Sequence, residues 1–305
     1  MSTNSAADNA PLRAALPLVV VLTLVWGTNW PLFPLAMREV SVWTFRAISV
    51  TTAGLALLLM ARLLGQSLWV PPAHRRTLVV AALLYLVVWN VASAYAAVLI
   101  PSGQAAILGF TMPLWAALAA WALLGQKLER RALLAVALSG LGVVLLIARG
   151  AQTYANAPLG FALGLLAGVA WAAGTLVLKQ RPVPVPALVL SGWQMLVAAV
   201  PIVAMALWLG QGPWFMPSWT TVALITYISL VPMAIGNAAW FTIASRLPGN
   251  VAGLSSVMVP VVAMISGAIV HGEPLGLTQW LAMLCCASGL GLMVYKPASK
   301  SVAKA

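Results

Sequence analysis

Apolar runs of about twenty residues, each long enough to cross a bilayer as a helix, alternate with short polar segments along almost the whole chain. There are ten such runs: Ala14–Leu35, Val42–Leu64, Thr77–Val98, Ser102–Leu124, Ala132–Ala148, Pro158–Leu178, Ala187–Leu209, Trp219–Ile243, Asn250–Val270 and Leu277–Tyr295. The short segments of alternating polarity that membrane β-strands require do not occur. The pattern therefore predicts an all-α polytopic membrane protein with ten transmembrane helices.

Composition and charge indicate the environment and the orientation. Of 305 residues, 63% are hydrophobic and 7% are charged, which is too little charge for a soluble surface. The net charge of +12 comes from Lys and Arg in short loops, which is typical of topology signals and not of a nucleic-acid-binding face. If the N-terminus is cytoplasmic, only Arg38, Arg46 and Arg149 lie on or near the opposite side. The positive-inside rule thus predicts a bacterial inner-membrane protein with both termini in the cytoplasm.

Residues of the third and fourth runs recur in the eighth and ninth. At a constant spacing of 147 positions, the matching pairs are Asn90 with Asn237, Pro101 with Pro248, Pro113 with Pro260, and Gly125 with Gly272. A five-helix unit has an odd number of spans, so the second copy must be inverted in the membrane, as in many alternating-access transporters. The expected organisation is a polar tail at 1–11, a first repeat at 12–149, a linker at 150–157, an inverted repeat at 158–296 and a basic tail at 297–305.

Short motifs in the two repeats resemble a known family. Gly272-Glu273-Pro274-Leu275 and its weaker copy Gly125-Gln126-Lys127-Leu128 follow the fourth helix of each half, and Trp26 and Trp171 lie in the first helices. With the Pro in each fourth helix, these features resemble the EamA-type domain of the drug/metabolite transporter superfamily, which includes bacterial amino-acid exporters of the YddG type. The resemblance implies a central cavity lined chiefly by helices 1–4 and 6–9, with helices 5 and 10 at the periphery.

Acidic side chains are absent from all ten runs. The four acidic residues fall in tails or loops: Asp8, Glu39, Glu129 and Glu273. This argues against a membrane carboxylate that exchanges protons for cations, and it favours facilitated export. The adjacent Cys285 and Cys286 suit neither a disulfide nor a metal site, and no acids, bases or metal ligands converge, so we expect no enzyme, metal or other cofactor. We expect His271 and Glu273 to have structural roles at a helix end, with proton coupling as the alternative.

Uncharged polar and aromatic side chains in the middle of the runs are the candidates for substrate binding. Trp offers a large apolar face and one N–H donor, while Asn and Gln both donate and accept hydrogen bonds. Helix packing and interhelical hydrogen bonds are their alternative role. The candidates are Trp26, Tyr85, Trp89, Asn90, Trp115, Trp171, Gln194, Asn237 and Trp240. Pro113 and Pro260 should each kink a helix, as hinges or as static kinks that shape the cavity.

Arg46 is the one charged residue well inside a run. Its guanidinium suits a clamp for the carboxylate of an amino or organic acid. The alternative, favoured by the neighbouring Trp43, is a side chain that extends to the membrane surface.

These observations together predict a transporter that exports amino acids, aromatic and other neutral ones first, or similar small metabolites by alternating access. Drugs or lipid-like compounds are the alternative substrates, and a membrane-embedded enzyme or a scramblase is the alternative of another class. The expected partners are the lipid bilayer and the small-molecule substrate, without nucleic acid or an obligate protein partner.

Overall fold

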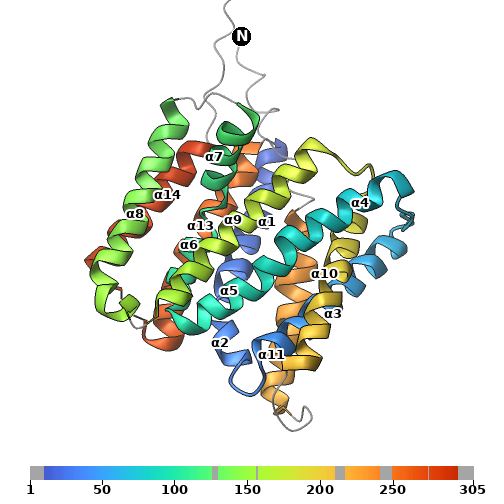
Figure 1. Ribbon diagram of the computed structural model, residues 1–305, viewed down its shortest axis with the longest axis horizontal. Coiled ribbons are helices and arrows are strands. Elements are labelled where there is room, and N and C mark those ends of the chain that lie inside the picture. Colours follow the sequence, from blue (N-terminus) through green and yellow to red (C-terminus); the bar gives the residue numbers. More distant parts are fainter. Residues whose placement is uncertain are drawn as a thin grey trace, which may run out of the picture.

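The structure is a computed structural model that describes residues 10–125, 130–155, 157–209, 217–240, 249–273 and 275–294. These ranges are helical and contain no β-strand (Figure 1). Six of the described helical stretches are long and apolar enough to cross a membrane, and four shorter apolar helices accompany them. All ten predicted runs therefore contain helix, and the prediction of an all-α polytopic membrane protein is confirmed. The predicted tails lie outside the described residues, apart from residues 10 and 11.

The helices of the first half are α1 (Ala10–Asn29), α2 (Leu32–Ala36), α3 (Val42–Leu63), α4 (Pro72–Ala81), α5 (Val88–Leu99), α6 (Ser102–Gly109), α7 (Met112–Leu124) and α8 (Arg130–Ala155). Those of the second half are α9 (Pro158–Gln180), α10 (Ala187–Leu209), α11 (Trp219–Ile228), α13 (Gly249–His271) and α14 (Leu277–Val294). Two π-helical segments, η1 (Ala82–Val87) and η2 (Ser229–Ile235), continue α4 into α5 and α11 into the helical residues up to 240.

Two predicted runs need correction. The first run is not one helix, because the chain turns at Trp30 and Pro31 between α1 and α2, and Pro31 has no N–H to continue a helix. The fourth run breaks at Phe110 and Thr111, so that Pro113 occupies the first turn of α7, where proline is tolerated. The residues of the expected linker at 150–157 are helical as far as Ala155, because α8 continues into them, and the division of the chain into two repeats and a linker stays a prediction.

The two halves run in opposite directions. We call the end of the bundle where α2 ends and α9 begins the distal end; it is at the bottom in Figure 1, opposite the start of α1. A side chain at Gly160, near the start of α9, would touch Leu99 and Ile100 at the end of α5. Ser218, just before α11, contacts Glu39 in the turn after α2. Hence α1 ends where its counterpart α9 begins.

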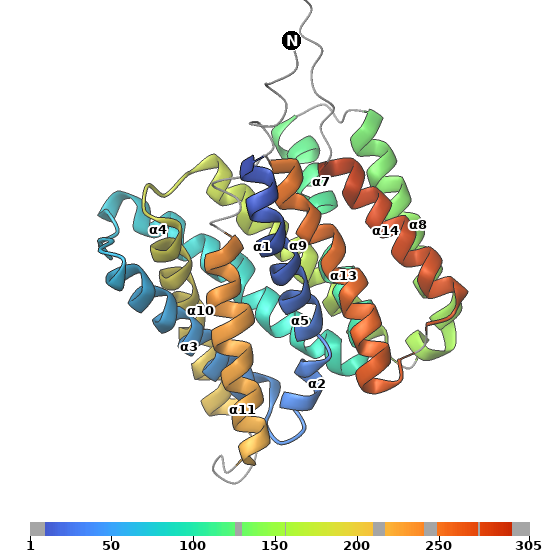
Figure 2. The ribbon, with the colours of Figure 1, turned by 180° about the vertical axis from the view of Figure 1, so that it is seen from behind.

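The halves are interleaved and do not lie as two separate blocks. The four most extensive helix pairs each join one half to the other: α8 with α14, α3 with α10, α5 with α9, and α1 with α13. Figure 2 shows α8 and α14 side by side at one edge of the bundle and α3 and α10 at the other. Gly125 and Gly272, separated by the repeat spacing, both have positive φ angles (63° and 65°) directly after the fourth helix of each half. The backbone thus repeats where the sequence repeats.

Candidate substrate-binding cavity

A cavity of about 400 Å³ lies between the two halves. This volume is in the range of small-molecule binding sites. Eight of the nine predicted substrate-binding residues line it: Trp26, Tyr85, Trp89, Asn90, Trp171, Gln194, Asn237 and Trp240. Arg46 lines it too, whereas Trp115 lies outside the lining. Within the described residues, α8, α13 and α14 contribute nothing to the lining, so the cavity lies off-centre, toward α3 and α10.

Aromatic side chains from both halves form one continuous wall of the cavity. The rings of Trp89 and Trp171 are 4.7 Å apart between centroids, and those of Tyr85 and Trp171 are 5.3 Å apart. Trp30 extends the wall, with its ring 6.2 Å from that of Trp89. All three pairs meet edge to face, the geometry that the charge distribution of aromatic rings favours. The wall offers flat apolar surface to a ligand.

The tryptophan of helix α1 ties that helix to the second half. Trp26 Nε1 donates a hydrogen bond to the carbonyl oxygen of Pro232 in η2, at 2.9 Å. Its ring lies 5.8 Å from the ring of Trp240. Because both partners belong to the second half, these contacts link α1 directly to that half.

Two equivalent asparagines satisfy backbone carbonyls of the π-helical segments. Asn90 Nδ2 donates to the carbonyl oxygen of Leu86 in η1 at 2.8 Å, and Asn237 Nδ2 donates to that of Met233 in η2. A π-helical turn widens the regular hydrogen-bond ladder and is frequent at functional sites. The two side chains therefore support the wide turns from the cavity side, a role different from the interhelical hydrogen bond considered as their alternative.

A buried hydrogen bond crosses the cavity wall between the halves. Tyr85 Oη donates to Gln194 Oε1 at 2.9 Å, and Gln194 is 1% exposed. The amide nitrogen of Gln194 is buried without a hydrogen-bond partner among the described residues. Gly174 of α9 lies directly against the Tyr85 ring and leaves space for it. Tyr85 is thus fixed by contacts to α9 and α10.

Arg46 does not extend to the membrane surface; its side chain is 2% exposed. The guanidinium carbon lies 4.3 Å from the ring centroid of Phe33 and 4.8 Å from that of Phe45. Arg46 Nη2 donates to Ser93 Oγ at 3.2 Å. The expected alternative of a surface-directed side chain is therefore wrong, because these two rings and Ser93 hold the cation against the distal part of the cavity.

Two stretches of the chain, residues 13–148 and 158–295, match the EamA-like transporter family. The chain belongs to this family. Both EamA-like stretches contribute to the cavity, and their match to a transporter family agrees with the two repeats and the membrane-length helices. The protein is a multi-pass membrane protein of a transporter family.

Relatives of this EamA-family chain are themselves named as transporters. The uncharacterized transporter YvbV of Bacillus subtilis is 23% identical over 300 residues, covering 95% of this chain and 94% of that protein. The inner membrane transporter YedA of Escherichia coli K12 is 26% identical over 278 residues (89% and 88%). The probable amino-acid metabolite efflux pump of the same organism is 30% identical over 182 residues (56% and 60%). A crystal structure covering 92% of this chain superposes with a TM-score of 0.64 at 20% identity, which supports the fold.

Polar contacts join the halves of this EamA-family protein at the distal end. The carboxylate of Glu273 accepts hydrogen bonds from Ser102 N and Ser102 Oγ, both at 2.6 Å, and from Gly103 N at 3.0 Å, at the start of α6. His271 Nε2 donates to the carbonyl oxygen of Pro31 at 2.6 Å. Both contacts lie at helix ends, and a structural role for these two residues stays a prediction.

Glu39 makes a third distal contact. Its Oε2 accepts a hydrogen bond from Ser218 N at 2.7 Å. The backbone N–H and the hydroxyl of Ser218, and then the hydroxyl of Thr221, hold the pKa of Glu39 below its ordinary value of 4.5. The three distal contacts hold the first half and the second half together at this end.

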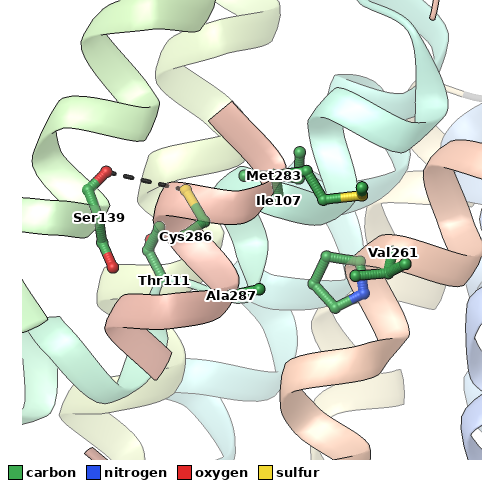
Figure 3. Close-up of a pocket in the computed structure, with 8 residues that line it drawn as sticks. Ile107, Thr111, Ser139, Val261, Met283, Cys286 and Ala287 are labelled. Carbon is green, nitrogen blue, oxygen red and sulfur yellow. Dashed lines mark hydrogen bonds between the residues drawn. The ribbon is translucent and has the colours of Figure 1, made fainter. Parts of the chain in front are cut away.

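The remaining candidates lie away from the cavity. Trp115 Nε1 donates to Thr111 Oγ1 at 3.0 Å beside the helix break. Pro260 lies inside the continuous helix α13 and borders a void of about 10 Å³ that has room for about one water molecule. Ser139, Cys286 and Met283 surround this void, with Cys286 Sγ 3.8 Å from the carbonyl oxygen of Ser139 (Figure 3). In the described part of the chain, no three His, Cys, Asp or Glu side chains lie close enough together to hold a metal ion.

The sequence analysis missed several lining residues near the distal end, among them Asn29, Trp30, Phe33 and Ser93. Asn29 and Trp30 directly precede Pro31, and this proline inside an apolar run was the available signal for a local break that turns side chains inward. Ser93 lies three positions after Asn90 on the same helical face, a spacing that could have found it.

Proposed function

We propose that this EamA-family protein exports amino acids or similar small metabolites across the bacterial inner membrane by facilitated alternating access. The observation that carries the proposal is the cavity between two inverted halves, walled by uncharged aromatic and amide side chains from both. A relative named as an inner membrane transporter and another named as a probable amino-acid metabolite efflux pump support the location and the substrate class.

Because the two halves are equivalent and inverted, the bundle can adopt two arrangements, one open to each side of the membrane, in which the halves exchange conformations. In the present arrangement the distal end is held by the contacts of Glu39, His271 and Glu273. Opening toward the distal side requires that these contacts separate while the opposite end closes. The turn at Trp30 and Pro31, the break at Phe110 and Thr111, and α13 at Pro260 are the proposed places of bending, because each lacks a regular backbone hydrogen bond.

The charge distribution supports an orientation with the distal end outside. Basic residues gather at the opposite end, at the termini of α3, α4, α8 and α9: Arg62, Arg75, Arg76, Arg130, Arg131, Lys179 and Arg181. An excess of Lys and Arg is typical of the cytoplasmic side. Among the described lining residues none carries a carboxylate, so protons have no acidic group there to exchange with the substrate. This favours movement down the substrate gradient.

The test is efflux from proteoliposomes loaded with labelled amino acids, with and without an imposed pH gradient. The proposal predicts that neutral and aromatic amino acids are released faster from these proteoliposomes than from loaded liposomes without protein. The imposed pH gradient should leave the rate unchanged. Efflux that the pH gradient accelerates would show that export is coupled to protons and is not facilitated. If folded, inserted protein releases no amino acid, drugs and lipid-like compounds become the substrates to test, and lipid scrambling in the same vesicles becomes the activity to measure.

A pair of tryptophan variants links transport to the cavity. Trp171→Ala removes the centre of the aromatic wall and should lower efflux about tenfold or more, since a stacked aromatic contact and its buried area are lost. Trp208→Ala is the matched control, because Trp208 is 80% exposed near the end of α10 and is not among the described residues that line the cavity. Equal efflux from the two variants would show that substrate does not pass the aromatic wall.

A further inference from the structure

Among the described residues that line the cavity, Arg46 is the only one with a charged side chain. It lies in the distal part, with Phe33 and Ser93 as its neighbours. A buried cation in a membrane protein is costly unless a counter-charge or a full set of hydrogen bonds compensates it. The compensation that Arg46 has within the protein therefore decides what it can bind.

That compensation is incomplete. A guanidinium has five N–H donors, and the structure gives Arg46 one hydrogen bond, to Ser93 Oγ. Its Nε is buried without a partner among the residues that the structure describes. The carboxylates of Glu39 and Glu273 are engaged at the distal end by Ser218 and by Ser102 and Gly103. The two phenylalanine rings stabilise the cation through their faces but neutralise no charge.

The same contacts hold the guanidinium in place before a ligand arrives. Phe33 and Phe45 lie at 4.3 Å and 4.8 Å from its carbon atom, and Ser93 holds one nitrogen. A planar guanidinium with free donors binds a carboxylate through two parallel hydrogen bonds. Because the side chain is already ordered, little conformational entropy is lost when it binds.

We propose that Arg46 is the specificity-determining residue of the cavity and that it takes the carboxylate of an anionic or zwitterionic substrate whose apolar part lies on the aromatic wall. The inference rests on the proposed transport function and names its substrate class. The lining residues that the structure describes offer a cation for a carboxylate but no carboxylate for an ammonium group. The carboxylate is therefore required for binding, whereas an amino group is not.

The test uses the detergent-solubilised full chain and quenching of its tryptophan fluorescence by three probes of similar shape. These are 3-phenylpropionate, the uncharged 3-phenylpropionamide and the cationic phenylethylamine. The wild type should bind the carboxylate about tenfold or more tighter than the amide, since a hydrogen bond to a charged group is lost with the amide. It should bind the amine more weakly than either. Equal affinities of the wild type for the carboxylate and the amide would overturn the proposal without any variant.

Three variants assign the preference to one side chain. Arg46→Gln should bind carboxylate and amide equally, and Arg46→Lys should keep part of the preference, since it keeps the charge but loses the planar fork. Arg38→Gln is the matched control, because it removes the same charge from an exposed position near the distal end and should behave as the wild type. A carboxylate preference that survives in folded Arg46→Gln would overturn the proposal. If Arg46→Gln does not fold, Arg46→Lys decides: an unchanged preference in it overturns the requirement for the planar fork.

Efflux measured in parallel separates this inference from the transport function. Carboxylate binding that depends on Arg46, without efflux of any amino acid, would overturn the transport proposal and leave the anion site in place. Efflux that is equally fast for wild type and Arg46→Gln, and for carboxylates and amides, would leave the transporter and overturn the anion site.

Discussion

Tyr85 of η1 and Gln194 of α10 are buried side chains joined by a hydrogen bond. Their hydrogen bond satisfies one acceptor of the Gln194 amide, while its Nε2 already lies without a partner among the described atoms. A further loss at this position would leave a buried amide with neither end satisfied. Such a group costs more than the hydrogen bond that satisfied it contributed.

Tyr85→Phe should therefore destabilise the protein by about 1–3 kcal/mol, because it keeps the ring but removes the donor to Gln194. The double variant Tyr85→Phe/Gln194→Met should recover most of this loss, because both polar partners are then replaced by apolar groups. The measurement is the thermal unfolding midpoint of wild type, both single variants and the double variant in detergent. Additive losses in the double variant would show that the two side chains act independently.

Which single residues line the cavity was partly predictable from the sequence. Asn90, Gln194 and Asn237 stand out because an amide in the middle of an apolar run must form hydrogen bonds with the protein or with a ligand. Trp30 and Phe33 do not stand out, because aromatic residues near the end of a run are usual at a membrane surface. Trp115 lies outside the lining because the break at Phe110 and Thr111 sets the direction of α7, and that geometry is not contained in the hydrophobic pattern.

At the scale of elements, the two π-helical segments repeat with the sequence. The segment η1 begins at Ala82 and η2 begins at Ser229, separated by the spacing of the repeat, and each provides the carbonyl that a cavity asparagine binds. A π-helical turn holds one residue more than an α-helical turn, so it rotates the residues that precede it relative to those that follow. These turns thus set which residues of the third and eighth spans face the cavity.

Deletion of Leu84, a lipid-facing residue of η1 that is 45% exposed, should restore α-helical pitch and rotate α4 relative to α5 by about 100°. Residues of α4 on one side of the deletion, and Tyr85 and Asn90 on the other, could then not all keep their present partners, so we expect efflux to be lost while helix content, measured by circular dichroism, stays unchanged. Leu84→Ala, which keeps the chain length, should transport like the wild type. A deletion variant with normal efflux would show that the wide turn is not needed.

The helices were more predictable than their irregularities. The bounds of α10 match the predicted run, because an apolar stretch between polar loops has one natural length in a bilayer. The breaks after α1 and α6 lie next to prolines, which have no N–H for a helical hydrogen bond. The hydrophobicity of a run does not reveal them. The π-helical segments have no signal in composition, because the same apolar residues serve both kinds of helix.

At the scale of the whole molecule, the contact of Glu39 with Ser218 makes the link between the two halves depend on ionisation. The ionised Glu39 is stabilised by Ser218 and Thr221, and this holds its pKa below 4.5 in the folded state. A carboxyl whose pKa is lower in the folded than in the unfolded chain stabilises the fold above the unfolded pKa. That contribution disappears as the pH falls through the lower, folded value.

Comparison of wild type with Glu39→Gln over a range of pH tests this contact. The wild type should unfold at the higher temperature at pH 7, and the difference should shrink as the pH falls below 4.5. Thermal unfolding in detergent, at constant ionic strength, is the measurement. A difference that persists unchanged in acid would mean that the Glu39 charge does not contribute to the link between α11 and the turn after α2.

The interleaving of the halves has a consequence for how the protein is made. Since α1, α3, α5 and α8 each have their main partner in the second half, the first five spans leave the ribosome before the surfaces that cover them exist. These spans therefore stay in the lipid without their partners until α9 to α14 are inserted. During that time Arg46 and the cavity amides face the bilayer or one another. Synthesis of the last span therefore completes the fold, and a chain stopped before it should be a substrate for membrane proteases.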